Sequence, residues 1–285
     1  MKKLNLNLDL NLKSLIKNPL AQALFAVTVV ALLEAVLFFL LPKVMLALVP
    51  NDQKWSDFPI SLISLINAVF AFIFTYKCFD LYDTADLKRK IWRFVMFSMA
   101  FMIIGHVVSI LMRFCFSVEI ARPPTWPEWL GYLWILPCLY VALLRQYRLV
   151  RTDSKPNVIM KHGLILALIV LVFILTLVSP LFSPTFISLP ERIYSLWQIC
   201  WSFAILIIAV SMLSEIYSGI ISMSWKLIIS AVFVMCIYYA MFVFIGSHNN
   251  LKSNELLMIF TQTLIQSATI LIAVSGYFER KIMAR

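Results

Sequence analysis

Eight long apolar segments occupy most of this 285-residue chain, and they constrain its fold more than any other feature. Each segment is roughly 20 to 26 residues long, enough for a helix to cross about 30 Å of hydrocarbon. The connections between them are roughly 6 to 16 residues long, too short to form a separate soluble domain. The segments are residues 19–41, 58–78, 92–116, 127–147, 158–182, 192–216, 225–247 and 254–278.

We therefore predict an all-α, polytopic integral membrane protein with eight transmembrane helices. The membrane domain covers residues 19–278, between an N-terminal tail at 1–18 and a C-terminal tail at 279–285. The composition agrees, since 13% of the residues are charged, against about 25% in soluble domains. Within the N-terminal tail, Leu alternates with polar residues, which is typical of a strand. We interpret it as a loosely ordered tail at the membrane surface; a partner-binding strand is the alternative.

The basic residues predict an orientation. Of the 24 Lys and Arg residues, 18 lie in the two tails and the even-numbered connections, and 6 lie on the other side. Cytoplasmic segments retain positive charge, so we expect both ends inside a bacterial cytoplasmic (inner) membrane, with no signal peptide removed. The net charge of +10 does not indicate nucleic-acid binding, because the cations are divided among helix ends. They should instead attract anionic headgroups of the lipid bilayer.

Motifs for catalysis are absent from the sequence. It contains neither a zinc-protease helix motif nor a phosphate loop, and the five cysteines lack the spacing of a zinc or redox pair. Only His106 lies deep in a predicted span, so no pair of deep histidines could hold a haem. We predict a protein that is not an enzyme and that uses no metal and no cofactor.

Polar residues inside the spans carry the most functional information, because a carboxyl or imidazole group in hydrocarbon must face a partner or water. Counted from the helix ends, Glu34, Asn67, His106 and Gln262 lie at a similar depth in the outer half of the membrane. We expect Glu34 and His106 to lie close enough to interact directly or through one water. The set has two interpretations: hydrogen bonds that join the helices, or a polar pocket that opens outward.

Aromatic residues at the same depth favour the pocket. Its predicted lining suits an amphipathic or cationic small molecule, through apolar contact and cation–π interaction. Aromatic side chains that face lipid are the alternative. Pro137 should kink its helix and orient these side chains. The predicted ligand-binding residues are Glu34, Asn67, His106, Tyr132, Trp134, Trp201 and Gln262.

Two dipeptides predict a weak internal repeat. Trp92-Arg93 opens the third span, and Trp225-Lys226 opens the seventh in the same way, 133 positions later. At this offset His106 falls on Tyr239, and the first four spans fall on the last four. The pattern suggests a parallel duplication of four spans each.

Residues 124–139 carry a family resemblance. This segment, Pro-Thr-Trp-Pro-Glu-Trp-Leu-Gly-Tyr-Leu-Trp-Ile-Leu-Pro-Cys-Leu, resembles the "P-S-x-A-D-x-x-Y-L-x-x-Y-P-L" segment of multi-spanning sensor modules. Such modules precede diguanylate cyclase, phosphodiesterase or histidine-kinase domains in bacterial signalling proteins. Tyr132 and Pro137 keep the spacing of the family, whereas Glu128 stands one position away from its acid.

The resemblance implies a receptor-like sensor. Since the chain runs only about seven residues past its last span, we expect the output domain on a separate cytoplasmic signalling partner. The main alternative is a small transporter in which Glu34 and His106 couple proton movement to substrate. A structural subunit of a membrane complex, without a ligand, is the third.

Overall fold

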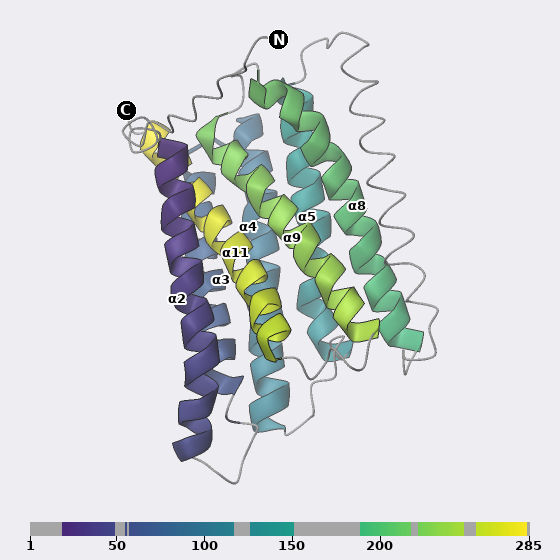
Figure 1. The fold of residues 1–285 in the computed structure, drawn as a ribbon. Coiled ribbons are helices and arrows are strands. Elements are labelled where there is room, and N and C mark those ends of the chain that lie inside the picture. Colours follow the sequence, from purple (N-terminus) through teal and green to yellow (C-terminus); the bar gives the residue numbers. More distant parts are fainter. Residues whose placement is uncertain are drawn as a thin grey trace, which may run out of the picture.

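A computed structural model describes residues 19–48, 55, 57–116, 126–150, 189–217, 222–247 and 255–283, and every regular element in these ranges is helical (Figure 1). Seven of the described helices are long and apolar enough to cross a membrane, which confirms the all-α membrane class. The predicted span 158–182 and the tail 1–18 lie outside the described residues. The elements are α2 (Pro19–Leu48), α3 (Phe58–Asp80), α4 (Leu87–Ile110), the π-turn η2 (Leu111–Cys115), α5 (Trp126–Val150), α8 (Leu189–Tyr217), α9 (Met223–Ser247) and α11 (Glu255–Met283).

Several helices extend beyond the predicted apolar segments. Helix α2 continues to Leu48, α11 continues to Met283 within the predicted tail 279–285, and α4 begins at Leu87, ahead of its predicted start at Trp92. At α4 the cause is a cap, because the Asp86 carboxylate accepts a 2.7 Å hydrogen bond from the backbone N–H of Lys88. Hydropathy locates the part of a helix that lies in hydrocarbon, whereas capping decides where the helix begins.

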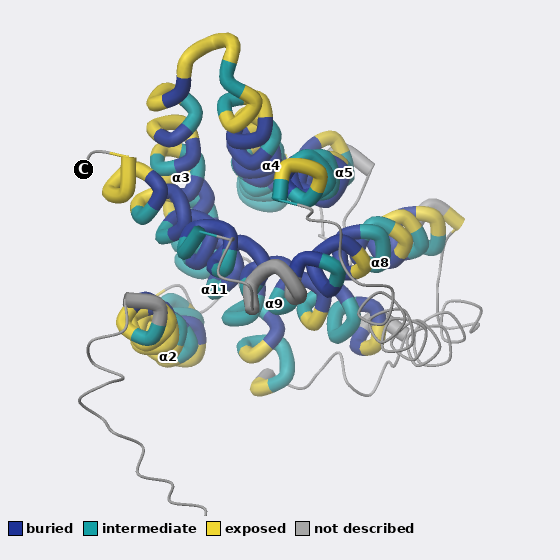
Figure 2. Tube along the Cα trace, turned by 90° about the horizontal axis from the view of Figure 1, so that it is seen from above, coloured by how far each residue is buried: buried dark blue, intermediate teal, exposed yellow. Residues whose placement is uncertain are grey.

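Six of the helices form two rows of three. Helices α3, α4 and α5 pack in sequence order as one row, and α8, α9 and α11 form the other. The rows meet at two seams, where α3 contacts α11 and α5 contacts α8. Helix α2 lies outside the rows, against α11 and α3, and Figure 2 shows most of its surface exposed.

Both seams join helices that run in the same direction. At the first, Trp129 stacks on Tyr194 and, further along, Tyr140 contacts Trp201, so the residue numbers of α5 and α8 rise together. At the second, Ser64 of α3 meets Gln266 of α11, and later positions meet at Gly276. Helices α5 and α8 therefore end at the same end of the bundle, and Val150 and Leu189 lie at opposite ends.

Basic residues gather at one end of the bundle, here called the basic end, where α2, α4 and α9 begin. In that half the space between the rows is filled by large apolar side chains. Trp92 and Trp225 are 1% and 3% exposed, and their ring centroids lie 5.7 Å apart across the rows. The described cations of this end are Lys77, Lys88, Arg89, Lys90, Arg93, Arg145, Arg148, Lys226, Arg280 and Lys281.

A buried hydrogen bond ties α11 to the turn between α3 and α4 at the basic end. The Tyr82 hydroxyl donates to Glu279 Oε1 over 2.5 Å, and both residues are buried. Burial, and then the bond to Glu279, raises the pKa of Tyr82 well above its ordinary value. The phenol therefore stays protonated at neutral pH and keeps donating to the carboxylate.

Two glycines allow α4 and α5 to cross closely. A Cβ atom on Gly131 would lie 2.2 Å from the backbone nitrogen of Gly105 and 2.6 Å from the carbonyl oxygen of Phe101. A Cβ on Gly105 would lie 2.5 Å from the Tyr132 ring. Small residues at helix crossings are the usual means of close packing in membranes. Here they also fix the position of Tyr132.

Pro137 lies buried inside α5, and its position explains the contact with α8. Proline has no backbone N–H, so the carbonyl of Leu133, four residues earlier, lacks its helical donor. The indole N–H of Trp197 supplies a 3.0 Å hydrogen bond to this carbonyl, and the Gln198 amide donates to the carbonyl of Tyr132 over 3.2 Å. In a membrane such carbonyls need protein partners.

We expect Trp197→Phe to lower the free energy of unfolding by about 1–3 kcal/mol, because the Leu133 carbonyl loses its donor. In a Pro137→Ala background the loss should be much smaller, since alanine restores the helical N–H. Denaturant unfolding in detergent micelles measures this coupling. Trp134→Phe, at an exposed position of α5, is the matched control and should change stability by less than about 0.5 kcal/mol. Equal losses in both backgrounds would contradict this account.

Candidate functional site

A cavity of about 420 Å³ lies between the two rows in the half away from the basic end. It lies near the ends at which α3, α5, α8 and α11 begin, and all seven described membrane helices contribute to its wall. Its size falls in the ordinary range for small-molecule sites. The polar residues that line it are Asp57, Ser61, Ser64, His106, Ser109, Arg113, Tyr132, Tyr194, Tyr238, Tyr239 and Gln262.

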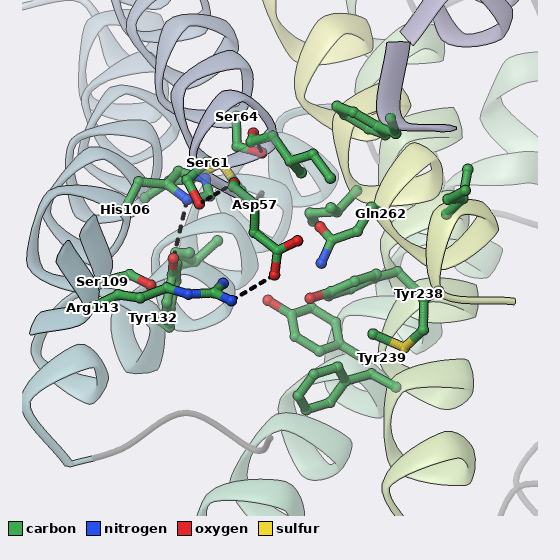
Figure 3. Close-up of a pocket in the computed structure, with 18 of the residues that line it drawn as sticks. Asp57, Ser61, Ser64, His106, Ser109, Arg113, Tyr132, Tyr238, Tyr239 and Gln262 are labelled. Carbon is green, nitrogen blue, oxygen red and sulfur yellow. Dashed lines mark hydrogen bonds and ion pairs between the residues drawn. The ribbon is translucent and has the colours of Figure 1, made fainter. Parts of the chain in front are cut away.

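An ion pair between the start of α3 and η2, in one row, lines the cavity. Arg113 Nη2 lies 2.5 Å from Asp57 Oδ2, and the two side chains are 25% and 39% exposed. Figure 3 shows the pair between His106 and Tyr132 on one side and Gln262 and the tyrosines of α9 on the other.

Both residues of this pair lie at the end of a helix, where the backbone positions their side chains. Asp57 occupies the N-cap position of α3, yet its carboxylate makes no capping hydrogen bond and instead meets Arg113. Arg113 lies in the π-turn η2, which ends α4. Such local departures from α-helical geometry are frequent at functional sites.

His106 and Tyr132 form a second polar pair in the wall. The Tyr132 hydroxyl lies 3.1 Å from His106 Nδ1, and the two rings meet edge to face with centroids 5.6 Å apart. The close crossing of α4 and α5 at Gly105 holds both rings in place. The imidazole thus has a partner on the neighbouring helix.

Aromatic side chains supply most of the remaining wall. They come from α2, α5, α8 and α9, so they surround the ion pair from several sides. Tyr239, the position that matches His106 in the predicted repeat, lines the same cavity. The aromatic lining consists of Phe38, Tyr132, Tyr194, Tyr238, Tyr239 and Phe242.

Packed side chains close the cavity toward the basic end. Met102, Ile135 and Ile265 line it and are at most 7% exposed. Just beyond them, the Thr269 hydroxyl lies 3.4 Å from the sulfur of Met102 and joins the two rows. The cavity is therefore separated from the basic end by the apolar core of the bundle.

Glu34 belongs to a polar cluster beside the cavity. The Asn67 amide donates to Glu34 Oε1 over 2.6 Å and to Gln266 Oε1 over 3.0 Å, and Gln266 donates to the Ser64 hydroxyl over 2.6 Å. Ser64 lines the cavity, so the chain of hydrogen bonds connects Glu34 with its wall. Glu34 is 6% exposed, and its second carboxylate oxygen has no hydrogen-bond partner among the described residues.

The predicted pair of Glu34 and His106 is wrong as a direct contact. Glu34 bonds to Asn67, whereas His106 bonds to Tyr132. Helix α2 packs against α11 and α3, while His106 on α4 meets α5. Depth along a helix can be read from sequence, whereas the neighbour of that helix cannot.

The predicted site residues divide into three groups. His106, Tyr132 and Gln262 line the cavity, and Asn67 with Glu34 lies directly behind Ser64. The structure does not bring the two predicted tryptophans into the cavity. Trp134 is 48% exposed on the bundle surface, and Trp201 packs against Tyr140 and Trp197. Trp134 thus lies on the outer surface of α5, and Trp201 packs between α5 and α8.

Sequence reasoning missed Asp57 and Arg113 because both lie at span ends, where charges are ordinary. A signal was nevertheless present. Arg113 lies three residues inside the predicted end of the third span, on the side that carries few cations. A cation at such a position needs a partner or water.

Metal chemistry finds no support in the described ranges, where no three His, Cys, Asp or Glu side chains are placed to hold an ion. Neither a protein-family model, nor a curated protein, nor a solved structure matches the chain. Function is therefore argued from the site itself.

Proposed function

We propose that this multi-pass membrane protein is a receptor-like sensor that binds a small molecule in the central cavity and signals at the basic end to a separate cytoplasmic partner. The observation that carries the proposal is the floor of the cavity, the packed layer of Met102, Ile135 and Ile265 that closes it toward the basic end. A cavity suited to a ligand occupies one half of the bundle, and packed apolar residues fill the other. Such an arrangement can bind without providing a path across the membrane.

The floor also supplies a physical link between the cavity and the basic end. Met102 and the buried Trp92 lie on the same helix, and Trp92 contacts Trp225 in the other row. A ligand that moves α4 therefore changes how the rows pack near the basic residues. To act as a signal, it must bind two arrangements of the rows with different affinity.

The proposal includes eight spans with both ends inside. The beginning of α2 and the end of α11 lie at the same end of the bundle in Figure 1, which agrees with an even number of crossings. The parallel α5 and α8 support the same number, because Val150 and Leu189 lie at opposite ends. The basic end would face the cytoplasm of a bacterial inner membrane.

We further propose that each row supplies three of the four spans in one half of the predicted repeat. The offset of 133 maps α3, α4 and α5 onto α8, α9 and α11, which is one row onto the other. It maps each seam onto the other seam, and both seams are parallel. Trp92 and Trp225, which match at this offset, contact each other, as expected of residues near a two-fold axis.

A small transporter is the second candidate, and the same arrangement favours it. Transporters built from repeats bind substrate at the interface of the repeats, where this cavity lies. Transport would require the packed floor to open toward the basic end. The structural-subunit alternative is favoured by no specific feature of the described residues.

Binding without uptake separates the two candidates. We expect some members of a panel of small amines, acids and amino acids to raise the Tm of the purified protein by several degrees, since binding at 100 times Kd adds about 2.7 kcal/mol. The same compounds, radiolabelled, should not accumulate in proteoliposomes. Accumulation that depends on the protein would reject the receptor in favour of the transporter.

A pair of variants ties the response to the cavity. Ser109→Trp adds a bulky side chain in the cavity wall and should abolish the rise in Tm. Thr28→Trp, on an exposed face of α2, should leave it unchanged. Loss of the response in both variants, or in neither, would mean that the compounds bind elsewhere.

A further inference from the structure

The charges of the cavity define the kind of ligand it accepts. Besides His106, the ionisable acidic and basic side chains among the described lining residues are Asp57 and Arg113. These two form an ion pair, so their charges cancel. A ligand with a single charge would have to separate them and leave one charge without its partner. Leaving one charge of the pair without its partner is unfavourable, because each side chain is less than half exposed.

A zwitterion avoids this cost. Its anionic group can bind the guanidinium of Arg113, whose planar donors match a carboxylate in two-point contact. Its ammonium group can bind the Asp57 carboxylate, which the N-cap of α3 leaves to face the cavity. One internal ion pair is then exchanged for two pairs with the ligand, and no charge is left unpaired.

The remaining wall selects the body of the ligand. Aromatic rings from α2, α5, α8 and α9 surround the ion pair and offer apolar contact to a side chain. The volume of about 420 Å³ accommodates one small molecule of this kind. We infer that the cavity binds a zwitterion with an aromatic or apolar side chain, such as an apolar α-amino acid, with its two charges on Arg113 and Asp57.

This inference rests on the cavity of the proposed receptor and is tested with three probes of one shape. L-Phenylalanine carries both charges, 2-phenylethylamine only the positive one, and 3-phenylpropanoate only the negative one. Calorimetry on the full chain in phosphatidylglycerol nanodiscs should give phenylalanine at least tenfold tighter binding than either analogue. Equal affinities for the three, or no binding of phenylalanine, would overturn the inference.

Two variants should invert the preference in opposite directions. Arg113→Gln leaves the Asp57 carboxylate without its guanidinium, so the amine should bind best. Asp57→Asn leaves the guanidinium, so the acid should bind best. Lys43→Gln removes a cation near the same end, on an exposed face of α2, and should leave the order unchanged.

If a single variant fails to fold, the neutral pair Asp57→Asn with Arg113→Gln replaces it, because no lone charge remains. This double variant should bind the three probes within about threefold of one another. Retention of the preference for phenylalanine in the double variant would overturn the inference.

A lipid headgroup such as phosphatidylethanolamine also carries an ammonium and an anionic group. Competition between this lipid and phenylalanine in nanodiscs would support the headgroup as the zwitterion, and no competition would support the free amino acid. Uptake of phenylalanine into vesicles, with its preference intact, would reject the receptor proposal and leave the zwitterion site standing. Loss of the preference for phenylalanine, without any uptake, would reject the zwitterion site and leave the receptor proposal standing.

Discussion

Gly131→Ala should lower the free energy of unfolding by about 3 kcal/mol or more, at the upper end of the usual range for overpacking. The added Cβ would lie 2.2 Å from the backbone nitrogen of Gly105, and backbone cannot move aside as a side chain can. Alanine is favoured over glycine in a helix by about 1 kcal/mol, so a loss can only come from packing. Denaturant titration in micelles, followed by circular dichroism, measures it.

Gly276→Ala provides the graded control. A Cβ at this position would approach the Phe74 backbone to 3.0 Å, so a shift of a few tenths of an ångström would relieve the contact. We expect a much smaller loss than for Gly131→Ala. A Gly131→Ala protein as stable as the wild type would show that α4 and α5 do not cross at the distance described.

Asn67→Leu should destabilise the protein by about 3 kcal/mol, because two buried acceptors lose their donor at once. Glu34 Oε1 and Gln266 Oε1 both accept from this amide, and leucine has a similar size without the N–H groups. From the sequence alone, a loss of stability on replacing Glu34 would have been attributed to a His106 left without its partner. The structure instead assigns it to Asn67 and Gln266.

A double-mutant cycle tests this assignment. Glu34→Leu together with Asn67→Leu removes a donor and its acceptor, so their combined cost should be well below the sum of the single costs. Glu34→Leu with His106→Leu should be additive, since these residues have different partners. Additivity in the first cycle and coupling in the second would restore the pairing predicted from sequence. Thermal or denaturant unfolding in the same detergent suffices.

The positions of the helices could be predicted from the sequence far better than which helices pack against each other. Length and apolar character located all seven described spans, because hydrocarbon thickness limits a helix in a way that can be counted. One polar position of α11 could also be predicted, since Gln262 lies inside a span and lines the cavity. Which helix each face meets depends on packing, which no single span encodes.

The candidate site followed the same division. His106, Tyr132 and Gln262 could be found because polar side chains are rare inside spans. Trp134 could not be excluded by depth, since a tryptophan faces lipid or a cavity at little difference in cost. Asp57 was left out of the predicted site because an aspartate before a helix predicts a helix cap. Only the structure shows its carboxylate bound to Arg113 instead.

The side-chain hydrogen bonds around Pro137 also bear on motion. The carbonyls of Tyr132 and Leu133 bond to side chains of α8 rather than to α5 alone. The first turns of α5 can therefore tilt about this point by adjusting side-chain torsions, without breaking a turn of helix. Since Tyr132 lines the cavity within these turns, such a tilt of α5 would change the shape of the cavity wall.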